Sequence, residues 1–289
     1  MRPLILRFRR RSYDLSQRTH IMGVLNVTPD SFSDGGQFFG RQEAVEQGLR
    51  LAQAGADIVD IGGESTRPGA KDLEEDEEAR RVIPVIEDLR KQSDIPISID
   101  TRKAGVAERA LAAGADMIND ISALRFDERM AQVAAESQVP VVLMHMRGDP
   151  ATMQSDTHYD DLMGELLEFF RERIAYAEAK GIHPDRIILD PGIGFGKSLE
   201  RQHNLVLLKN LRQFRTLGKP LLIGPSRKAF IGKILGFAPQ ERDEGTMASV
   251  AVAIMNGANM VRVHEVERTH RVVQVVDAIL RCTPEDIEC

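Results

Sequence analysis

A short motif that recurs along the chain constrains the fold more than any other feature of the sequence. Ala54-Gly55-Ala56-Asp57, Ala113-Gly114-Ala115-Asp116 and Asn256-Gly257-Ala258-Asn259 each follow a helix-like stretch and precede a short apolar run. Each glycine suits the C-terminal cap of a helix, where a left-handed backbone is common. The repeat therefore predicts units in which a helix leads directly into a strand.

Other short apolar runs complete this pattern. Three of them begin with proline, which is tolerated as the first residue of a strand: 96–99, 140–143 and 220–223. With the runs at 21–25 and 186–189 there are eight, each followed by a helix-like segment. Eight strand–helix units predict an α/β fold, the (β/α)8 barrel. The alternative, an open doubly wound sheet, would usually carry Gly-x-Gly-x-x-Gly after its first strand, whereas Gly23 stands alone.

The length of the chain also suits a single barrel. Barrels of this kind typically need about 250 residues, and the chain has 289. Before the first barrel strand, the apolar residues Leu4, Leu6 and Phe8 alternate with Ile5 and Arg7, which predicts a short β-ribbon. We therefore predict a single domain with a ribbon at 1–19, a barrel at 20–281 and a tail at 282–289.

Composition and charge favour a protein that acts on small molecules. The residues are 42% hydrophobic, which predicts a sizeable core, and no apolar run is long enough to span a membrane. A net charge of -6 argues against non-specific nucleic-acid binding, which requires a basic face. The N-terminal apolar run is too short for a signal peptide, and Cys282 and Cys289 form neither a disulfide framework nor a zinc set. We therefore expect a cytoplasmic protein.

Polar side chains end all eight predicted strands. They are Asn26, Asp60, Asp100, Asn119 with Asp120, His145, Asp190, Ser226 with Arg227 and Lys228, and Arg262 with His264. Because the C-terminal ends of the strands carry the chemistry in a (β/α)8 barrel, this set predicts one pocket. Capping of the following helices could explain any single Asp, Asn or Ser, but it is a weaker explanation for eight strands in turn.

The predicted pocket has an acidic and a basic end. Asp100 and Asp190 can each accept two parallel N–H bonds, as from an amino-pyrimidinone, and Asn119 can both donate and accept. The donors and positive charges that suit phosphate oxygens come from a second group, which comprises Arg67, Lys228, Arg262 and His264. The set predicts a ligand with a flat heterocycle and a phosphate.

The segment 188–198 looks like a phosphate-binding loop but fails that pattern by one residue. The pattern needs Gly, four residues and then Gly-Lys-Ser or Gly-Lys-Thr, and Pro191 stands where the first glycine belongs. Proline has no N–H to donate to a phosphate. We therefore interpret the segment as a heterocycle-binding turn that begins at Asp190, with Lys197 as a peripheral charge. We interpret His145, between two methionines, as part of the pocket wall.

Long glycine-rich loops follow the first two predicted strands, and loops of this length in a barrel are usually functional. Including these loops, the chain closely resembles the dihydropteroate synthase family of folate biosynthesis. The matching stretches, in family order, are 23–36, 60–69, 99–101, 118–120, 143–146, 190–197, 226–228 and 262–264. The most specific are Gly-Val-Leu-Asn-Val-Thr-Pro-Asp-Ser-Phe-Ser-Asp-Gly-Gly and Asp-Ile-Gly-Gly-Glu-Ser-Thr-Arg-Pro-Gly.

The resemblance implies that 6-hydroxymethyl-7,8-dihydropterin diphosphate condenses with p-aminobenzoate to 7,8-dihydropteroate and pyrophosphate, assisted by Mg²⁺. The implied pterin site comprises Asp100, Asn119, Met144, Asp190, Lys228 and Arg262. The implied diphosphate site comprises Asn26, Thr66, Arg67, Arg262 and His264, with Asn26 as the side-chain ligand of Mg²⁺. The implied p-aminobenzoate site comprises Phe32, Pro68, Phe195, Ser226 and Arg227.

The implied chemistry needs no nucleophilic side chain, because the amine of p-aminobenzoate attacks and diphosphate leaves. Mg²⁺, Arg262 and His264 would stabilise the charge on pyrophosphate, with Lys228 also in the catalytic group. Asp34 would shield the pterin cation. The resemblance also implies a homodimer and a target of sulfonamides.

Two other functions are compatible with a pterin-binding barrel. A corrinoid-linked methyltetrahydrofolate methyltransferase shares the barrel and the pterin carboxylates, but it should lack the Thr-Arg-Pro-Gly and Ser-Arg-Lys stretches that are present here. A barrel that binds pterin without turnover would not need the phosphate-binding cations. We therefore favour the synthase.

Overall fold

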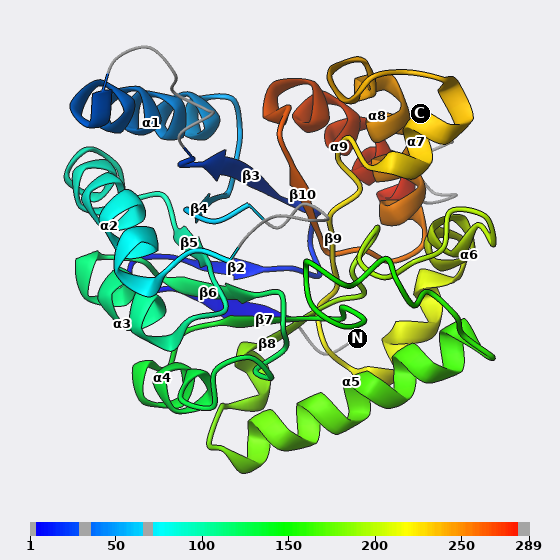
Figure 1. The fold of residues 1–289 in the computed structure, drawn as a ribbon. Helices are drawn as coiled ribbons and strands as arrows, with labels where there is room; N and C mark the ends of the chain where they lie inside the picture. The colour runs from blue at the N-terminus through cyan, green and yellow to red at the C-terminus, as the bar shows by residue number, and fades with distance from the viewer. Residues whose placement is uncertain (1–3, 29–35, 66–71, 283–289) are drawn as a thin grey trace.

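Eight parallel strands form a barrel in the computed structural model, which describes residues 4–28, 36–65 and 72–282 (Figure 1). The strands are β3 (His20–Asn26), β4 (Ile58–Gly62), β5 (Ile97–Asp100), β6 (Met117–Asp120), β7 (Val141–Met144), β8 (Ile187–Asp190), β9 (Leu222–Ile223) and β10 (Met260–Val263). They pair in the order β8-β7-β6-β5-β4-β3-β10-β9, and a parallel bridge between Leu189 and Leu221 brings β8 beside β9. The predicted barrel is confirmed.

Helices surround the barrel and alternate with its strands (Figure 1). They are α1 (Gly36–Gln53), α2 (Glu75–Gln92), α3 (Ala104–Ala113), α4 (Met130–Ser137), α5 (Leu162–Ala179), α6 (His203–Asn210), α7 (Ala229–Leu235), α8 (Asp243–Met255) and α9 (Val266–Arg281). Two helices, α7 and α8, follow β9, so this unit departs from the simple strand–helix repeat. The glycines of the repeated motif follow α1, α3 and α8 with φ of 103°, 116° and 103°, which confirms their helix-ending role.

The N-terminal ribbon closes one end of the barrel. Strands β1 (Ile5–Arg7) and β2 (Ser12–Asp14) pair antiparallel, as the alternating pattern predicted. Leu6 and Leu15 are buried against side chains from seven barrel strands, which are Met22, Ile58, Met117, Val142, Ile188, Leu222 and Met260. The interior at the N-terminal side is therefore a packed apolar plug, and open space for a ligand remains at the opposite end of the strands.

A larger apolar core fills the space between the strands and the helices. The outward-facing residues of the strands, such as Ile61, Ile99 and Val261, pack there against helix residues such as Val82 and Leu89. Inward-facing positions alternate with these, so successive residues of each strand point to the two sides of the barrel wall. Within the described residues, every helix is too short or too polar to cross a membrane.

Candidate active site

The strand register places several predicted site residues at one level of the barrel. Asn26 pairs with Gly62, Gly62 with Asp100, and Asp100 with Asn119. On the neighbouring strands β7 and β8, Met144 pairs with Asp190. Each of these residues is the last or, for Asn119, the penultimate residue of its strand, so the parallel pairing alone brings them to the same rim.

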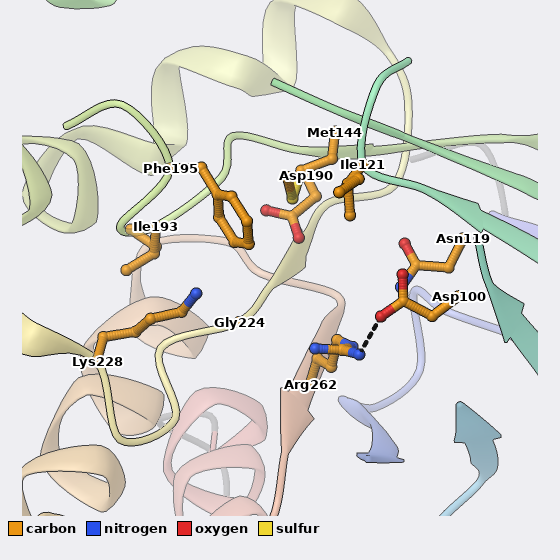
Figure 2. Close-up of a pocket in the computed structure, with 10 residues that line it drawn as sticks. All are labelled: Asp100, Asn119, Ile121, Met144, Asp190, Ile193, Phe195, Gly224, Lys228 and Arg262. Carbon is orange, nitrogen blue, oxygen red and sulfur yellow. Dashed lines mark hydrogen bonds and ion pairs between the residues drawn. The ribbon is translucent and has the colours of Figure 1, made fainter. Parts of the chain in front are cut away.

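Seven predicted residues line one pocket at this rim, and Figure 2 shows their side chains around it. The pocket is lined by Asp100, Asn119, Ile121, Met144, Asp190, Ile193, Phe195, Gly224, Lys228 and Arg262. The amino group of Lys228 and the carboxylate of Asp190 both point into the space, and the Lys228 nitrogen lies 4.1 Å from the centre of the Phe195 ring. All six predicted pterin-site residues are therefore brought together, together with Phe195.

Arg262 is held by two carboxylates from neighbouring strands. Its Nη2 donates to Asp100 Oδ2 at 2.6 Å and its Nε donates to Asp60 Oδ2, also at 2.6 Å. The same Asp60 oxygen accepts from Asn119 Nδ2 at 3.1 Å. The guanidinium is therefore fixed in orientation before any ligand is present, because Asp60 holds the inner end and Asp100 the outer end.

Asp60 lies deeper in the barrel than the sequence predicted. We expected it to end its strand, but β4 continues for two residues to Gly62, and Asp60 pairs in register with Ser98. Its side chain is fully buried, and Oδ1 has no hydrogen-bond partner among the described residues. A buried charge of this kind needs a partner, and Arg262 supplies it. We predicted Asp60 as a member of the strand-end set but assigned it no contact to a ligand, and its partnership with Arg262 was not predicted.

Burial changes the pKa values of the charged groups in the pocket. Burial raises the pKa of Asp100 to about 7, although the charge of Arg262 opposes the shift. Burial also raises the pKa of Asp190. Burial and the nearby Arg262 lower the pKa of Lys228 to about 8. For Arg262, burial would lower the pKa, but Asp60 and Asp100 outweigh it and the net shift is upward. The pocket therefore favours ligands whose own groups compensate these buried charges.

The glycine-rich turn after β8 presents Asp190, Ile193 and Phe195 to the pocket. Gly192 has a φ of 72°, and a Cβ there would lie 2.0 Å from the carbonyl oxygen of His145. The backbone N–H of Gly192 donates to Asp190 Oδ1 at 2.8 Å. Only glycine fits at position 192, where the turn passes close to the end of β7.

Lys197 corrects one prediction. We expected a peripheral charge, but its side chain is only 1% exposed and is among the largest fully buried side chains of the described residues. The alternating Gly-x-Gly-x-Gly turn brings Lys197 back behind β7, where Nζ lies 3.0 Å from Nδ1 of His145. This position could not be predicted, because glycine permits many backbone conformations and the path of a glycine-rich turn does not follow from its residues.

The remaining polar strand-end residues have other partners. Ser226 Oγ and His264 Nδ1 lie 2.9 Å apart, so these two residues form a pair beside the pocket. The guanidinium of Arg227 binds Asp243 of α8, at 2.9 Å from Nε, and does not line the pocket. Asp120 accepts from the backbone N–H groups of Ser122 and Leu124, so it caps its own turn.

Several predicted site residues lie outside the described residues. These are Phe32, Asp34, Thr66, Arg67 and Pro68. The described residues also add three lining positions that sequence reasoning missed, which are Ile121, Ile193 and Gly224. Ile121 is the first residue after β6 and Ile193 is the third after β8, so a search of the first three residues after each strand would have included both.

The donors available for a metal are few. The described residues contain no group of three or more His, Cys, Asp or Glu side chains arranged to hold an ion. Asn26 is exposed at the end of β3, where its amide oxygen is available to a ligand. An amide oxygen suits Mg²⁺ when phosphate oxygens and water complete the shell. The residues present therefore fit a metal that is bound mainly through a substrate.

Comparison with known proteins identifies the family. Residues 22–264 match the family model of pterin binding enzymes. A dihydropteroate synthase from Synechocystis sp. (strain ATCC 27184 / PCC 6803 / Kazusa) is 52% identical over 270 residues, which cover 93% of this chain and 93% of that protein. The chain belongs to the dihydropteroate synthase family.

Solved structures of the dihydropteroate synthase family have the same fold. The Xanthomonas albilineans dihydropteroate synthase with 4-aminobenzoic acid is 46% identical, with a TM-score of 0.90 over 97% of this chain and 100% of that one. The same organism's enzyme in complex with 7,8-dihydropteroate is 44% identical, with a TM-score of 0.87 over 96% of this chain and 100% of that one. The pocket described above thus lies in a barrel whose relatives bind a pterin product and 4-aminobenzoic acid.

Proposed function

We propose that the protein condenses 6-hydroxymethyl-7,8-dihydropterin diphosphate with p-aminobenzoate to give 7,8-dihydropteroate and pyrophosphate. The observation that carries this proposal is the convergence of Asp100, Asn119 and Asp190 with Lys228 and Arg262 in one pocket. Acceptors for a flat heterocycle and cations for a diphosphate occur together there. Membership of the family and a relative in complex with 7,8-dihydropteroate support the same reaction.

The pterin would bind between Asp190 and Asp100. Asp190 Oδ1 already accepts from Gly192, while Oδ2 makes no hydrogen bond to the described residues and faces the pocket (Figure 2). A ring N–H and an exocyclic N–H₂ can donate to this carboxylate and so offset the cost of its burial. Asn119 keeps its amide oxygen for a ring donor, because its N–H₂ is bound to Asp60.

Arg262 would contact both the pterin and the diphosphate. With its Nε fixed by Asp60, the outer N–H groups can turn from Asp100 toward a phosphate oxygen when the pterin supplies donors to Asp100. The guanidinium would then lie beside the heterocycle and close to the bond that breaks. Lys228 adds a second cation at the same side of the pocket. These groups would stabilise the charge that grows on pyrophosphate.

His264 is oriented toward the same task by Ser226. Ser226 Oγ accepts from the His264 backbone N–H at 3.3 Å, so its own hydroxyl proton is directed to Nδ1 of the imidazole. This arrangement leaves Nε2 as an N–H donor, which suits a phosphate oxygen. Ser226 would therefore act on the diphosphate end through His264, as well as framing p-aminobenzoate with Phe195.

Bond formation needs no side-chain nucleophile. The aniline nitrogen of p-aminobenzoate forms a bond to the pterin methylene carbon, the carbon–oxygen bond to diphosphate breaks, and the nitrogen loses a proton. Mg²⁺ bound by the diphosphate and by Asn26 would neutralise part of the leaving group's charge. The protein's part is to hold the two substrates in line and to supply fixed positive charge.

Other parts of the proposal concern the assembly and the location of the protein. We propose a homodimer, and the apolar residues exposed on α8 and α9 support it, among them Val252, Met255, Val275 and Ile279. A cytoplasmic location and the absence of nucleic-acid partners stay predictions from the sequence. The roles of Phe32, Asp34, Thr66, Arg67 and Pro68 also stay predictions.

An omission experiment tests the proposed reaction. Pyrophosphate release by the purified protein should require Mg²⁺, the pterin diphosphate and p-aminobenzoate together. Release at an equal rate without p-aminobenzoate would indicate a pterin diphosphatase. Methyl transfer from methyltetrahydrofolate to a corrinoid protein, without any reaction of the pterin diphosphate, would indicate the related methyltransferase.

A further inference from the structure

Lys197 is a buried cation on the turn that lines the pocket, and the proposed function has no use for it. Its Nζ donates to the carbonyl oxygen of Phe195 at 2.9 Å and to that of Gly192 at 3.2 Å, and it lies 3.0 Å from Nδ1 of His145. No carboxylate lies within ion-pair distance of this amine among the described residues, unlike Arg262. Its environment is therefore made of neutral acceptors.

The number of acceptors matches the number of protons on an ammonium. A lysine ammonium has three N–H donors and no acceptor, and here there are three acceptors around it. His145 can accept only if its Nδ1 carries no proton, and burial lowers the pKa of His145 well below its ordinary value, which keeps the ring neutral. In the tautomer that carries its proton on Nε2, the neutral ring presents a lone pair at Nδ1 to the Lys197 ammonium.

The two carbonyl groups belong to the turn that presents the ligand-binding residues. Gly192 follows Asp190 by two residues and donates to its carboxylate, and Phe195 lines the pocket. Both carbonyl groups accept from Lys197, which does not itself line the pocket, so the ammonium holds the turn from outside the pocket. The neighbouring carbonyl groups of Gly194 and Gly196 are bound from outside by Gln154 at 2.8 Å and Tyr159 at 3.0 Å.

We propose that Lys197 is a positioning residue for both substrates, because it fixes the Gly192 and Phe195 carbonyl groups and so sets where Asp190 and Phe195 stand in the pocket. This role rests on the proposed function, since it assumes that Asp190 binds the pterin and Phe195 frames p-aminobenzoate. Lys197 does not itself touch a substrate, so it acts through the shape of the turn and not on the reacting atoms.

The burial of this cation is costly, which argues against an incidental position. Burial lowers the pKa of Lys197 to about 7, and the negative charge of Asp190 opposes that shift. An apolar side chain of the same length would avoid the cost but would remove the Lys197 hydrogen bonds to both carbonyl groups. Among the described residues, only the carbonyl group of Gly192 has another donor, the Phe195 N–H at 3.1 Å. The amine is therefore required where several carbonyl groups converge, and glycine-rich turns create such sites.

The test is Lys197→Met, which keeps the length of the side chain and removes all its donors. We expect the KM values for the pterin diphosphate and for p-aminobenzoate both to rise about tenfold or more, because the turn loses two buried hydrogen bonds, while kcat at saturation changes by about twofold or less. A loss of folded protein alone would lower kcat and leave both KM values unchanged. A lower kcat with unchanged KM values, or unchanged kinetics, would overturn the proposal.

Asp277→Asn provides a matched control for stability. Asp277 is a buried charge on α9 that accepts from the backbone N–H of Thr19 at 2.9 Å and from its hydroxyl at 2.8 Å, at the opposite end of the barrel. At a similar fall in melting temperature, this variant should keep both wild-type KM values. If Asp277→Asn raised them as much as Lys197→Met does, the effect would be general softening and the proposal would be wrong.

A second pair of variants covers a failure of Lys197→Met to fold. His145→Asn keeps an acceptor near the Nδ1 position, whereas His145→Leu removes it. We expect His145→Leu to weaken binding of pterin-6-carboxylate to the folded protein and His145→Asn to restore most of it, and equal affinities for the two variants would overturn the proposal. Failure of the wild-type protein to bind any pterin would instead overturn the proposed function together with this role.

Discussion

The substitution Asp190→Asn tests two properties of this buried carboxylate, which are its hydrogen bonding to the pterin and the cost of its charge to the stability of the fold. Asp190 is only 5% exposed, and one of its oxygens is already bound by the Gly192 N–H at 2.8 Å. In the asparagine variant the amide oxygen can keep that bond, which turns the N–H₂ group toward the pocket. A pterin donor would then meet another donor, so the variant loses a charge-assisted hydrogen bond and gains a repulsive contact.

The size of the effect follows from the hydrogen bond that is lost. A buried hydrogen bond to a charged group contributes about 1.5–3 kcal/mol, and an unpaired donor adds to the loss. A loss of about 2–3 kcal/mol corresponds to about a 30- to 150-fold weaker pterin complex. The ligand-free protein should not be destabilised, because burial raises the pKa of Asp190 and the fold therefore disfavours its charged form.

Titration calorimetry with a non-reactive pterin and with p-aminobenzoate measures both affinities, and a thermal melt near neutral pH measures stability. We expect pterin affinity to fall strongly, p-aminobenzoate affinity to change by about twofold or less, and the melting temperature to stay the same or rise. Equal losses for the two ligands would refute the division of the pocket. A lower melting temperature would refute the statement that the charge of Asp190 is a cost to the fold.

Four further predictions follow from the same geometry. Asp60→Asn should lower both the melting temperature and kcat/KM, in contrast to Asp190→Asn, because it removes the buried charge that pairs with the Arg262 guanidinium; a melt and a rate measurement check it. The affinity for the pterin diphosphate should peak between pH of about 7 and about 8, where Asp100, with its pKa raised, is ionised and Lys228, with its pKa lowered, is still charged. Lys228→Met should remove the alkaline limb of that profile. Asn26→Ala should raise the Mg²⁺ concentration for half-maximal rate without changing the KM for p-aminobenzoate, which a metal titration measures.

The fold was predictable because it depends on patterns that repeat along the chain. The patterns are short apolar runs, glycines that end helices, and the alternation of Leu4, Leu6 and Phe8. Each favours a local structure that the fold contains. The strand-end residues were predictable for the same reason, since parallel register brings Asp100, Asn119 and Asp190 to one rim. The position of a residue at the end of a predicted strand therefore identifies several of the side chains that line the pocket.

The partners of these residues were not predictable in the same way. The sequence did not indicate that two helices, α7 and α8, follow β9, or that the guanidinium of Arg227 binds Asp243 of α8. Lys197 was expected at the surface, but three positive-φ glycines turn it inward. Both outcomes depend on backbone paths through irregular segments, which local residue preferences do not determine.

The stoichiometry of the complete reaction tests the central claim most directly. Purified protein supplied with Mg²⁺, the pterin diphosphate and p-aminobenzoate should form 7,8-dihydropteroate, identified by mass spectrometry, in equal amount to the pyrophosphate released. We expect equal amounts because the proposed mechanism uses no side-chain nucleophile. The diphosphate then leaves only when the amine of p-aminobenzoate forms its bond to the pterin. Pyrophosphate released in excess of dihydropteroate, or a pterin product without p-aminobenzoate, would contradict it.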